Sequence, residues 1–338
     1  MTTEASEKLL DLIQSHRVTA VIHVAARLGL AELLRDGPQT SDELAQATGA
    51  DRDALDRLLV ALSTVGICSA VSEGRYSLTE LGSGLDGAAQ HSFKNWAIFE
   101  GCMLTKRWDG LLDSIISGKT AAELLQNVDD NFDLMARTPE HVHMFNAAMT
   151  DLTRLVTPDV LQAYDFGAIS HLMDVGGGSG ELMGAVAREC SNIRGTVFDL
   201  PRCADAANRH FARLGLSDRV AFVAGDFFDS VPAMADAIIL KSIIHDWDDE
   251  RSCIILRNCR QALLPNGRLL LVERSMPEWP GVNDEDKSCA MSDLNMLRGP
   301  GGRERTETEY RRLLAECGFR TIAAHRAGRF NLLESCVH

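Results

Sequence analysis

One histidine follows a strongly apolar segment at a position that suits acid–base chemistry. The segment Ala237–Lys241 is almost fully apolar, as expected of a central parallel strand, and His245 comes shortly after it. Ligands of such sheets bind at the carboxyl ends of the strands. A lone histidine is usually a structural residue with satisfied hydrogen bonds. Because this one would lie beside a candidate cofactor loop, we predict that it acts as a general base.

The candidate cofactor loop is Asp174-Val175-Gly176-Gly177-Gly178-Ser179-Gly180, between an apolar strand and a helix that begins near Glu181. Glycines accept positive φ and allow a ligand to approach the backbone, and the helix offers free N–H groups. The spacing does not match the dinucleotide pattern G-x-G-x-x-G. Preceded by an acid, the loop suits a ligand with positive charge, such as S-adenosylmethionine. The alternative is an ordinary turn between a strand and a helix.

Further acids and an aromatic residue follow strands at the same predicted edge. Asp199 ends the second strand, 25 positions after the acid of the glycine loop, where an acid accepts hydrogen bonds from ribose hydroxyls. The alternative for Asp199 is an exposed or capping aspartate. After the third strand, Asp226 could accept from an adenine amino group while Phe227 packs on the ring. Glu273 ends the fifth strand at this edge.

Composition and charge narrow the class of protein. The 338 residues are 45% apolar and 24% charged, which is ordinary for globular proteins and allows two domains. The net charge of −14 argues against a nucleic-acid partner, which needs a basic face. Nine cysteines occur without a C-x-x-C pair, and no acid and histidine cluster has metal-ligand spacing, so we expect reduced thiols and no metal. Without a secretion sequence or a membrane-spanning apolar stretch, we expect a cytoplasmic enzyme.

The N-terminal part is predicted to be helical. Residues 7–36 form an expected helix whose apolar run from Val18 to Leu34 should be buried, in the chain or against another subunit. Two shorter helices and a hairpin follow, which together give a winged-helix pattern. Such a module often binds DNA, but its second helix starts with Asp51–Arg57, three acids against two arginines. We therefore expect a dimerisation unit and no contact with nucleic acid.

Residues 90–165 are expected to be helical and unusually rich in large apolar side chains. These are Phe93, Trp96, Phe99, Met103, Trp108, Met135, Met144, Phe145 and Met149. Methionines and aromatics at helical spacing suit either an adaptable apolar pocket or a plain core, and both interpretations stay open.

Pro158 and Gly167 mark the passage into a second domain near residue 160, so we expect domains at 1–160 and 161–338. In the second domain strands and helices alternate, and the chain ends in two strands of an antiparallel pair. This order predicts an α/β fold in which a mostly parallel sheet has helices on both faces.

With these motifs, the chain resembles the S-adenosylmethionine-dependent small-molecule O-methyltransferases, which include plant caffeate and flavonoid enzymes and bacterial enzymes of polyketide and antibiotic tailoring. The resemblance covers nearly the whole chain. It rests on Asp174–Gly180, Gly225-Asp226-Phe227-Phe228, Lys241-x-x-x-His245-Asp246-Trp247 and Gly301-Gly302-Arg303-Glu304-Arg305-Thr306. It implies a Rossmann-like class I methyltransferase domain with a seven-stranded sheet and a winged-helix dimerisation domain. It also implies a homodimer in which N-terminal residues of the partner close each pocket.

The resemblance implies roles for single residues. His245 matches the family's catalytic base, and Glu273 and Glu304 match the two carboxylates that flank and orient it. The predicted cofactor contacts are Asp174, Gly176, Gly178, Asp199, Leu200, Gly225, Asp226, Phe227 and Lys241. The predicted substrate contacts are Trp96, Phe145, Met149, Asp246, Asn295 and Met296. Asn295 is polar where plant relatives tend to be apolar, so their substrate preference does not transfer.

The expected reaction is methyl transfer from S-adenosylmethionine to a hydroxyl of a small aromatic or polycyclic natural product. The base takes the hydroxyl proton, and the oxygen attacks the methyl carbon in line with the departing thioether. One rival is an enzyme of this fold that uses the cofactor for hydroxylation or a pericyclic step, which the retained base and carboxylates disfavour. The other is a DNA-binding regulator, which the charge disfavours. The sequence identifies neither the acceptor nor the position methylated, and it does not exclude a nitrogen or carbon acceptor.

Overall fold

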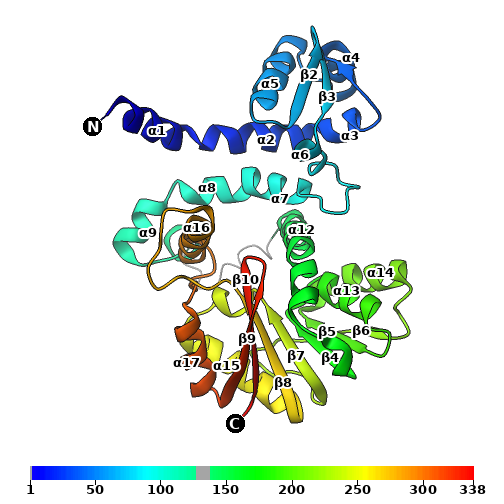
Figure 1. The fold of residues 1–338 in the computed structure, drawn as a ribbon, viewed down its shortest axis with the longest axis vertical. Coiled ribbons are helices and arrows are strands. Elements are labelled where there is room, and N and C mark those ends of the chain that lie inside the picture. Colours follow the sequence, from blue (N-terminus) through cyan, green and yellow to red (C-terminus); the bar gives the residue numbers. More distant parts are fainter. Residues whose placement is uncertain (1, 127–137) are drawn as a thin grey trace. The chain divides into compact units, whose positions relative to one another are not determined.

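The computed structural model describes residues 2–126 and 138–338. The chain divides into two compact units, residues 1–109 with 140–152 and residues 110–139 with 153–338. The long helix α12 (Pro139–Ala163) contributes its first part to one unit and its later part to the other (Figure 1). The predicted domain limits at 160 and 161 stay a proposal. The helical prediction for 90–165 includes 127–137 and thus Met135, which lie outside the described residues.

The first unit is mainly helical, with a small sheet in the order β1-β3-β2. Its helices are α1 (Thr3–Gln14), α2 (His16–Leu28), α3 (Leu30–Leu34), α4 (Ser41–Thr48), α5 (Arg52–Thr64), α6 (Glu80–Ser83), α7 (Lys94–Phe99), the π-helical turn η1 (Glu100–Leu104), α8 (Thr105–Trp108) and the first part of α12. Its strands are β1 (Gln39–Thr40), β2 (Cys68–Ser72) and β3 (Arg75–Leu78), all antiparallel. The capping box between Thr40 and Glu43 opens α4 as predicted. Leucines of α3, α4 and α5 form the core that holds this winged-helix arrangement together.

The prediction of one continuous N-terminal helix over residues 7–36 is wrong. Gly29 ends α2 with φ 66°, a left-handed conformation that a glycine adopts at little cost, and α3 begins directly after it. The apolar run from Val18 to Leu34, which was expected to be buried, is only partly buried within one chain. Its buried residues are Ala25, Ala26, Leu30, Ala31 and Leu34, whereas Val18 is exposed. The helix α1 buries no residue at all.

The second unit is an α/β domain with a seven-stranded sheet in the order β6-β5-β4-β7-β8-β10-β9 (Figure 1). Its strands are β4 (His171–Val175), β5 (Arg194–Asp199), β6 (Val220–Ala224), β7 (Ala235–Lys241), β8 (Leu263–Glu273), β9 (Phe319–Ala327) and β10 (Phe330–Val337). Its helices are α9 (Leu111–Ser117), α10 (Ala121–Gln126), the later part of α12, α13 (Glu181–Glu189), α14 (Ala204–Leu214), α15 (Asp249–Ala262), α16 (Asp284–Arg298) and α17 (Glu307–Glu316). Short 3-10 turns are η2 (Phe166–Ala168), η3 (Pro201–Cys203) and η4 (Ile244–Asp246). The pairs among β4 to β8 are parallel and β10 is antiparallel to β8 and β9, so the predicted fold is confirmed.

Two apolar cores cover the two faces of this sheet. Neighbouring strand residues alternate between them, since Leu172 belongs to the core with α13 and α14 and Met173 to the core with α15 and α17. Both faces are therefore buried, as in other parallel sheets, and the polar groups gather beyond the strand ends. The carboxyl ends of β4, β5, β7 and β8 meet at one edge, because Val175 pairs with Phe198 and Lys241 with Val272.

Candidate active site

A short turn after β7 carries the predicted base. Ser242 leaves the strand with φ 55°, and the turn η4 follows. Glu273, the last residue of the neighbouring strand β8, accepts hydrogen bonds through Oε1 from the N–H groups of Ile243 at 2.9 Å and Ile244 at 2.7 Å. One carboxylate oxygen of Glu273 thus fixes the backbone immediately before His245.

The imidazole of His245 lies among three carboxylates. Its Nδ1 is 3.0 Å from Glu304 Oε1 and 3.9 Å from Glu273 Oε2, while its Nε2 is 3.6 Å from Asp246 Oδ1. The hydroxyl of Ser292 also donates to Glu304 Oε1, at 2.6 Å. The two glutamates are buried, and within the described residues their Oε2 atoms make no hydrogen bond. The structure therefore brings the three predicted catalytic residues together.

These charges control the protonation of the site. Burial by itself would lower the pKa of His245, but the carboxylates of Glu304, Glu273 and Asp246 raise that pKa to about 10. For Glu304, burial is outweighed by His245 and the hydrogen bonds, and its pKa is lowered. Burial raises the pKa of Glu273, and it raises the pKa of Asp246 to about 7. With this pKa, His245 is an imidazolium at neutral pH that is hydrogen-bonded to ionised Glu304.

Glu304 is placed by contacts with α16 and with the turn of His245. Its own N–H donates to Asp293 Oδ1 at 2.8 Å, and the N–H of Arg303 donates to the carbonyl of His245 at 2.8 Å. Gly302 packs on the same turn so closely that an added Cβ would lie 2.1 Å from the carbonyl oxygen of His245. Sequence reasoning missed Ser292; its spacing of four from Met296, which puts both on one face of a helix, was the available indication.

The glycine loop has the backbone that the sequence predicts. Gly176, Gly178 and Gly180 have φ of 75°, 57° and 75°, in the region that favours glycine. A Cβ on Gly176 would lie 2.4 Å from a side-chain atom of Ile243, whereas one on Gly178 would meet no atom within 4 Å. The loop is thus packed at Gly176 and open at Gly178, where a ligand could reach the backbone.

Asp199 holds this loop in place. Its Oδ2 accepts from the N–H of Gly178 at 2.8 Å and its Oδ1 accepts from the N–H of Leu200 at 2.6 Å. Burial is the main reason that the pKa of Asp199 is raised. The capping interpretation and the ligand interpretation of Asp199 are therefore compatible, because each carboxylate oxygen has a second lone pair.

Asp174, the last but one residue of β4, and Lys241, the last residue of β7, lie on neighbouring strands at this edge of the sheet. Burial raises the pKa of Asp174 to about 7, against the effect of Lys241. Burial lowers the pKa of Lys241, against the effect of Asp174. The Nζ of Lys241 donates to Ser242 Oγ at 3.4 Å. The loop therefore borders two carboxylates, those of Asp174 and Asp199, which suits a ligand that carries positive charge and hydroxyl groups.

The predicted adenine-binding residues lie beside the loop. The ring of Phe227 lies 3.7 Å from the position that a Gly176 Cβ would take. Asp226 Oδ1 accepts from the N–H of Phe228 at 2.8 Å, which forms the turn after β6. Gly225 leaves room for the ring of Phe198, since a Cβ on it would lie 2.4 Å from that ring. The nine predicted cofactor residues thus all lie at the carboxyl edge of β4 to β7, while their contacts with a ligand stay a prediction.

The predicted substrate residues fall in both units. Trp96, Phe145 and Met149 belong to an apolar cluster of the first unit, in which Phe99 has its ring centroid 5.9 Å from that of Trp96 and 5.8 Å from that of Phe145. In the second unit, Asp246 is next to His245, whereas Met296 is buried on α16 and Asn295 is partly exposed there. Their role as substrate contacts stays a prediction.

Two further structural facts concern metals and membranes. Among residues 2–126 and 138–338, no group of three or more histidines, cysteines and acids is arranged to hold a metal ion. Over the same described part of the chain, every helix is too short or too polar to cross a membrane.

Comparison with known proteins identifies the family. Residues 108–320 match the model of the O-methyltransferase domain, and residues 10–85 match that of the O-methyltransferase dimerisation domain. The chain belongs to the O-methyltransferase family. The predicted resemblance, activity class, cofactor S-adenosylmethionine and homodimer are confirmed at the level of this family, and the helix–helix–hairpin module belongs to a dimerisation domain.

Individual relatives agree with this assignment. The phenazine O-methyltransferase PhzM of Lysobacter antibioticus is 38% identical, and the match covers 93% of this chain and 91% of the relative. The crystal structure of LaPhzM has a TM-score of 0.93 at 36% identity and 99% coverage of both chains. An O-methyltransferase of neocarzinostatin biosynthesis, solved with S-adenosylmethionine and 2-hydroxy-5-methyl naphthoic acid, has a TM-score of 0.77 at 32% identity and covers 95% of this chain and 96% of its own.

Proposed function

We propose that this O-methyltransferase methylates a hydroxyl of a small aromatic or polycyclic natural product and that His245 is its general base. The contact that supports the base is the hydrogen bond between His245 Nδ1 and Glu304 Oε1 at 3.0 Å. It orients the ring and leaves Nε2 as the atom that takes the proton. The aromatic acceptor is supported by relatives, one named for phenazines and another solved with a naphthoic acid.

The residues at the sheet edge fit S-adenosylmethionine. Asp174 and Asp199 border the glycine loop, and the space where a Cβ of Gly178 would lie is open. When bound, S-adenosylmethionine supplies a methyl group on a positively charged sulfur. The proposed cofactor contacts are Asp174, Gly176, Gly178, Asp199, Leu200, Gly225, Asp226, Phe227 and Lys241. In this set the aspartates would meet the amino group and the ribose hydroxyls, and Phe227 would pack on the adenine ring.

The residues around His245 account for proton transfer. His245 Nε2 takes the proton of the acceptor hydroxyl, and ionised Glu304, which is hydrogen-bonded to Nδ1, stabilises the imidazolium that forms. General-base help of this kind contributes about 10²–10⁴-fold to the rate. Since the pKa of His245 is about 10, the imidazolium must first lose its proton, and a positive charge bound nearby would lower that pKa.

The acceptor hydroxyl must be held in line with the methyl group for transfer. The proposed substrate contacts are Trp96, Phe145, Met149, Asp246, Asn295 and Met296. Holding the acceptor oxygen in line with the methyl group contributes at least as much as the base, because orientation removes an entropic part of the barrier. We also propose domain limits of 1–160 and 161–338.

The test of this function measures products as well as rates. Purified enzyme is incubated with S-adenosylmethionine and hydroxylated fused aromatics, and mass spectrometry reports the gain of one methyl group and the release of S-adenosylhomocysteine. We expect His245→Ala to lower kcat by about 10²–10⁴-fold while the Kd of S-adenosylhomocysteine changes little. His325→Gln, on the far strand β9, is the matched control. Unchanged turnover in His245→Ala would show that His245 is not the general base. A product without an added methyl group would favour the hydroxylation or pericyclic alternative.

A cytoplasmic location is also part of the proposal. It is supported by the nine cysteines, all of which are free thiols, as is usual in reducing compartments. Fractionation of cells that express the protein checks it, and recovery from an oxidising compartment would contradict it.

A further inference from the structure

Arg305, directly after Glu304, buries its guanidinium against the turn that carries His245. The side chain is 1% exposed. Its Nη1 donates to the carbonyl of Ile244 at 3.1 Å and its Nη2 to the carbonyl of Trp247 at 2.8 Å. These two carbonyls stand on either side of His245 and Asp246, so a single planar group holds both ends of the turn.

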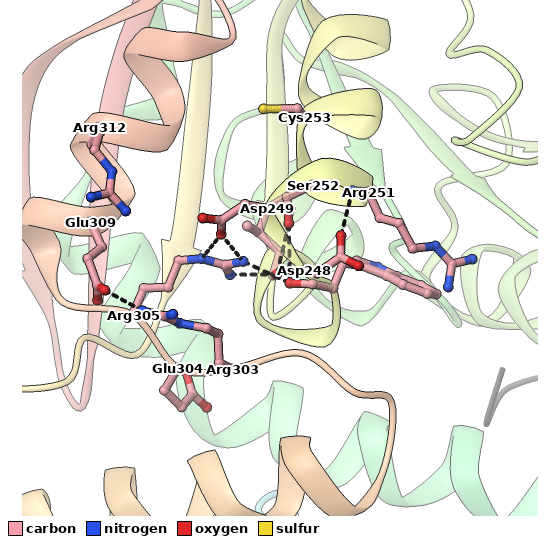
Figure 2. A network of polar contacts seen from close by, with 12 residues as sticks. Asp248, Asp249, Arg251, Ser252, Cys253, Arg303, Glu304, Arg305, Glu309 and Arg312 are labelled. Atoms are coloured by element: carbon pink, nitrogen blue, oxygen red, sulfur yellow. Dashed lines mark hydrogen bonds and ion pairs between the residues drawn. The ribbon is translucent and has the colours of Figure 1, made fainter. Parts of the chain in front are cut away.

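One carboxylate neutralises this buried cation. Asp249 Oδ1 accepts from Arg305 Nε at 2.9 Å and from Nη2 at 2.7 Å. Figure 2 shows the guanidinium of Arg305 reaching from the segment of Glu304 to Asp249 at the start of α15. The Asp249 side chain is 52% exposed, so the pair connects the buried turn with the protein surface.

The backbone of Arg305 is attached to the segment that follows β8, the strand that ends in Glu273. Its carbonyl accepts from the N–H of Met276 at 2.9 Å, and it forms an isolated parallel bridge with Ser275. The segment of Glu304 and Arg305 is therefore aligned with the extension of β8. The guanidinium of Arg305 then joins this segment to the turn of His245. The segment of Glu304, the extension of β8 and the turn of His245 are thus all held through Arg305.

A contribution to stability alone does not explain why a charged arginine is buried at position 305. A guanidinium loses its hydration when it is buried, and apolar residues of similar volume often replace a buried ion pair without loss of stability. The fork of an arginine, by contrast, can meet two carbonyls and a carboxylate at once, which the point charge of a lysine cannot do. The hydrogen bonds of the Arg305 guanidinium go to the turn of His245 and to the start of the helix that follows it.

We propose that Arg305 is a positioning residue for methyl transfer, which holds the turn Ile244–Trp247 at the distance from Glu304 that lets the imidazole of His245 meet that carboxylate. This inference rests on the proposed role of His245. It predicts that Arg305 acts on catalysis through the histidine and has little effect on cofactor binding. An arginine that served the fold alone would change the amount of folded enzyme and leave the chemistry of the folded fraction unaltered.

The experiment compares Arg305→Met and Arg305→Lys with the wild type, with Arg312→Met as the matched control. Arg312 lies on the neighbouring helix α17 with a side chain that is 63% exposed. We expect Arg305→Met to lower kcat by about 10²-fold, since a displacement of about 1 Å at a reacting group costs that much. The KM of the acceptor and the Kd of S-adenosylhomocysteine should change by less than about threefold, and Arg305→Lys should not restore kcat.

A double-mutant cycle distinguishes positioning from a separate effect. In the His245→Ala background, Arg305→Met should lower the residual rate by no more than about twofold, because residues that act as a unit are not additive. Equal losses in both backgrounds would overturn the inference. If His245→Ala itself has no effect, the proposed function fails; if it lowers kcat and Arg305→Met does not, only this inference fails.

Two measurements keep the inference testable if Arg305→Met does not fold. Asp249→Asn changes a half-exposed side chain and should lower kcat in the same direction by a smaller factor. NMR titration of the His245 imidazole, assigned with His245→Gln, should show a lower pKa in Arg305→Lys and in Asp249→Asn than in the wild type, because a loosened turn weakens the contact with Glu304. An unchanged imidazole titration together with unchanged kcat per folded enzyme would overturn the inference.

Discussion

Replacing Glu304 by glutamine removes a charge from the site while keeping its shape. The amide oxygen of glutamine can still accept from His245 Nδ1 and from Ser292 Oγ, which lie 3.0 Å and 2.6 Å from the present carboxylate oxygen. Two unit charges about 4 Å apart attract by about 4 kcal/mol at an effective dielectric constant of about 20, which corresponds to about three pKa units. The pKa of His245, about 10 in the wild type, is therefore expected to fall to about 7 in Glu304→Gln.

The assay is the pH dependence of kcat/KM with one acceptor for both enzymes. Only deprotonated His245 can act as a base, so activity rises with pH as the imidazolium loses its proton. In Glu304→Gln this rise should occur at lower pH, while the maximal kcat should fall, because the weaker base and its imidazolium lose the support of the anion. NMR titration of the imidazole gives the same pKa without turnover.

The same shift has a consequence for stability. The pKa of His245 is raised above its unfolded value of 6.5, so its contribution to the free energy of unfolding is complete below pH 6.5 and is lost as pH rises toward 10. The loss of stability in Glu304→Gln should therefore shrink over this interval. The control is Glu307→Gln, an exposed carboxylate paired with Arg311. A pH profile that stays in place, or that moves to higher pH, would refute the electrostatic account of the site.

Three other changes test the loop, the turn and the dimer. Gly302→Ala should lower kcat by about 10²-fold and stability by about 1–3 kcal/mol, because its Cβ would lie 2.1 Å from the carbonyl oxygen of His245; steady-state kinetics and thermal unfolding measure both. Asp199→Ala should weaken S-adenosylhomocysteine binding by tenfold or more in calorimetry, since the N–H of Gly178 loses a charged acceptor; equal affinity would remove Asp199 from the site. Ile13→Glu, at a side chain 63% exposed on α1, should make the dimer dissociate in sedimentation velocity, and an unchanged dimer would place the interface elsewhere.

The edge of the sheet could be predicted from the sequence because parallel strands end on one side. The sequence predicted this edge from apolar segments that end in an acid or are followed by His245. The structure places Asp174, Asp199, Glu273 and His245 at this edge of the sheet. The glycine spacing and the acid before it likewise predict the cofactor. These features depend on local sequence and on the order of strands, which a single chain displays.

The N-terminal helix could not be predicted in the same way. Hydrophobic periodicity continued through Gly29, and only the left-handed backbone at that glycine shows where α2 ends. Leu9, Leu10 and Ile13 on α1 are exposed in the single chain, and a pattern of apolar residues does not distinguish a surface that pairs with another subunit from an internal core.

The geometry around His245 is harder to predict from the sequence, because segments that are distant in the chain build it. Glu304 follows a glycine-rich break after α16, and its resemblance to a family motif was the only indication of its role. What turns its carboxylate toward the imidazole is a set of tertiary contacts: Ser292 on the carboxylate, Asp293 on its N–H and Arg305 on the turn of the histidine. A periodic pattern records which face of an element is buried, but not which polar group it meets there. The residues that align the base are therefore the ones that sequence reasoning finds last, and mutations at them should alter the chemistry more than the fold.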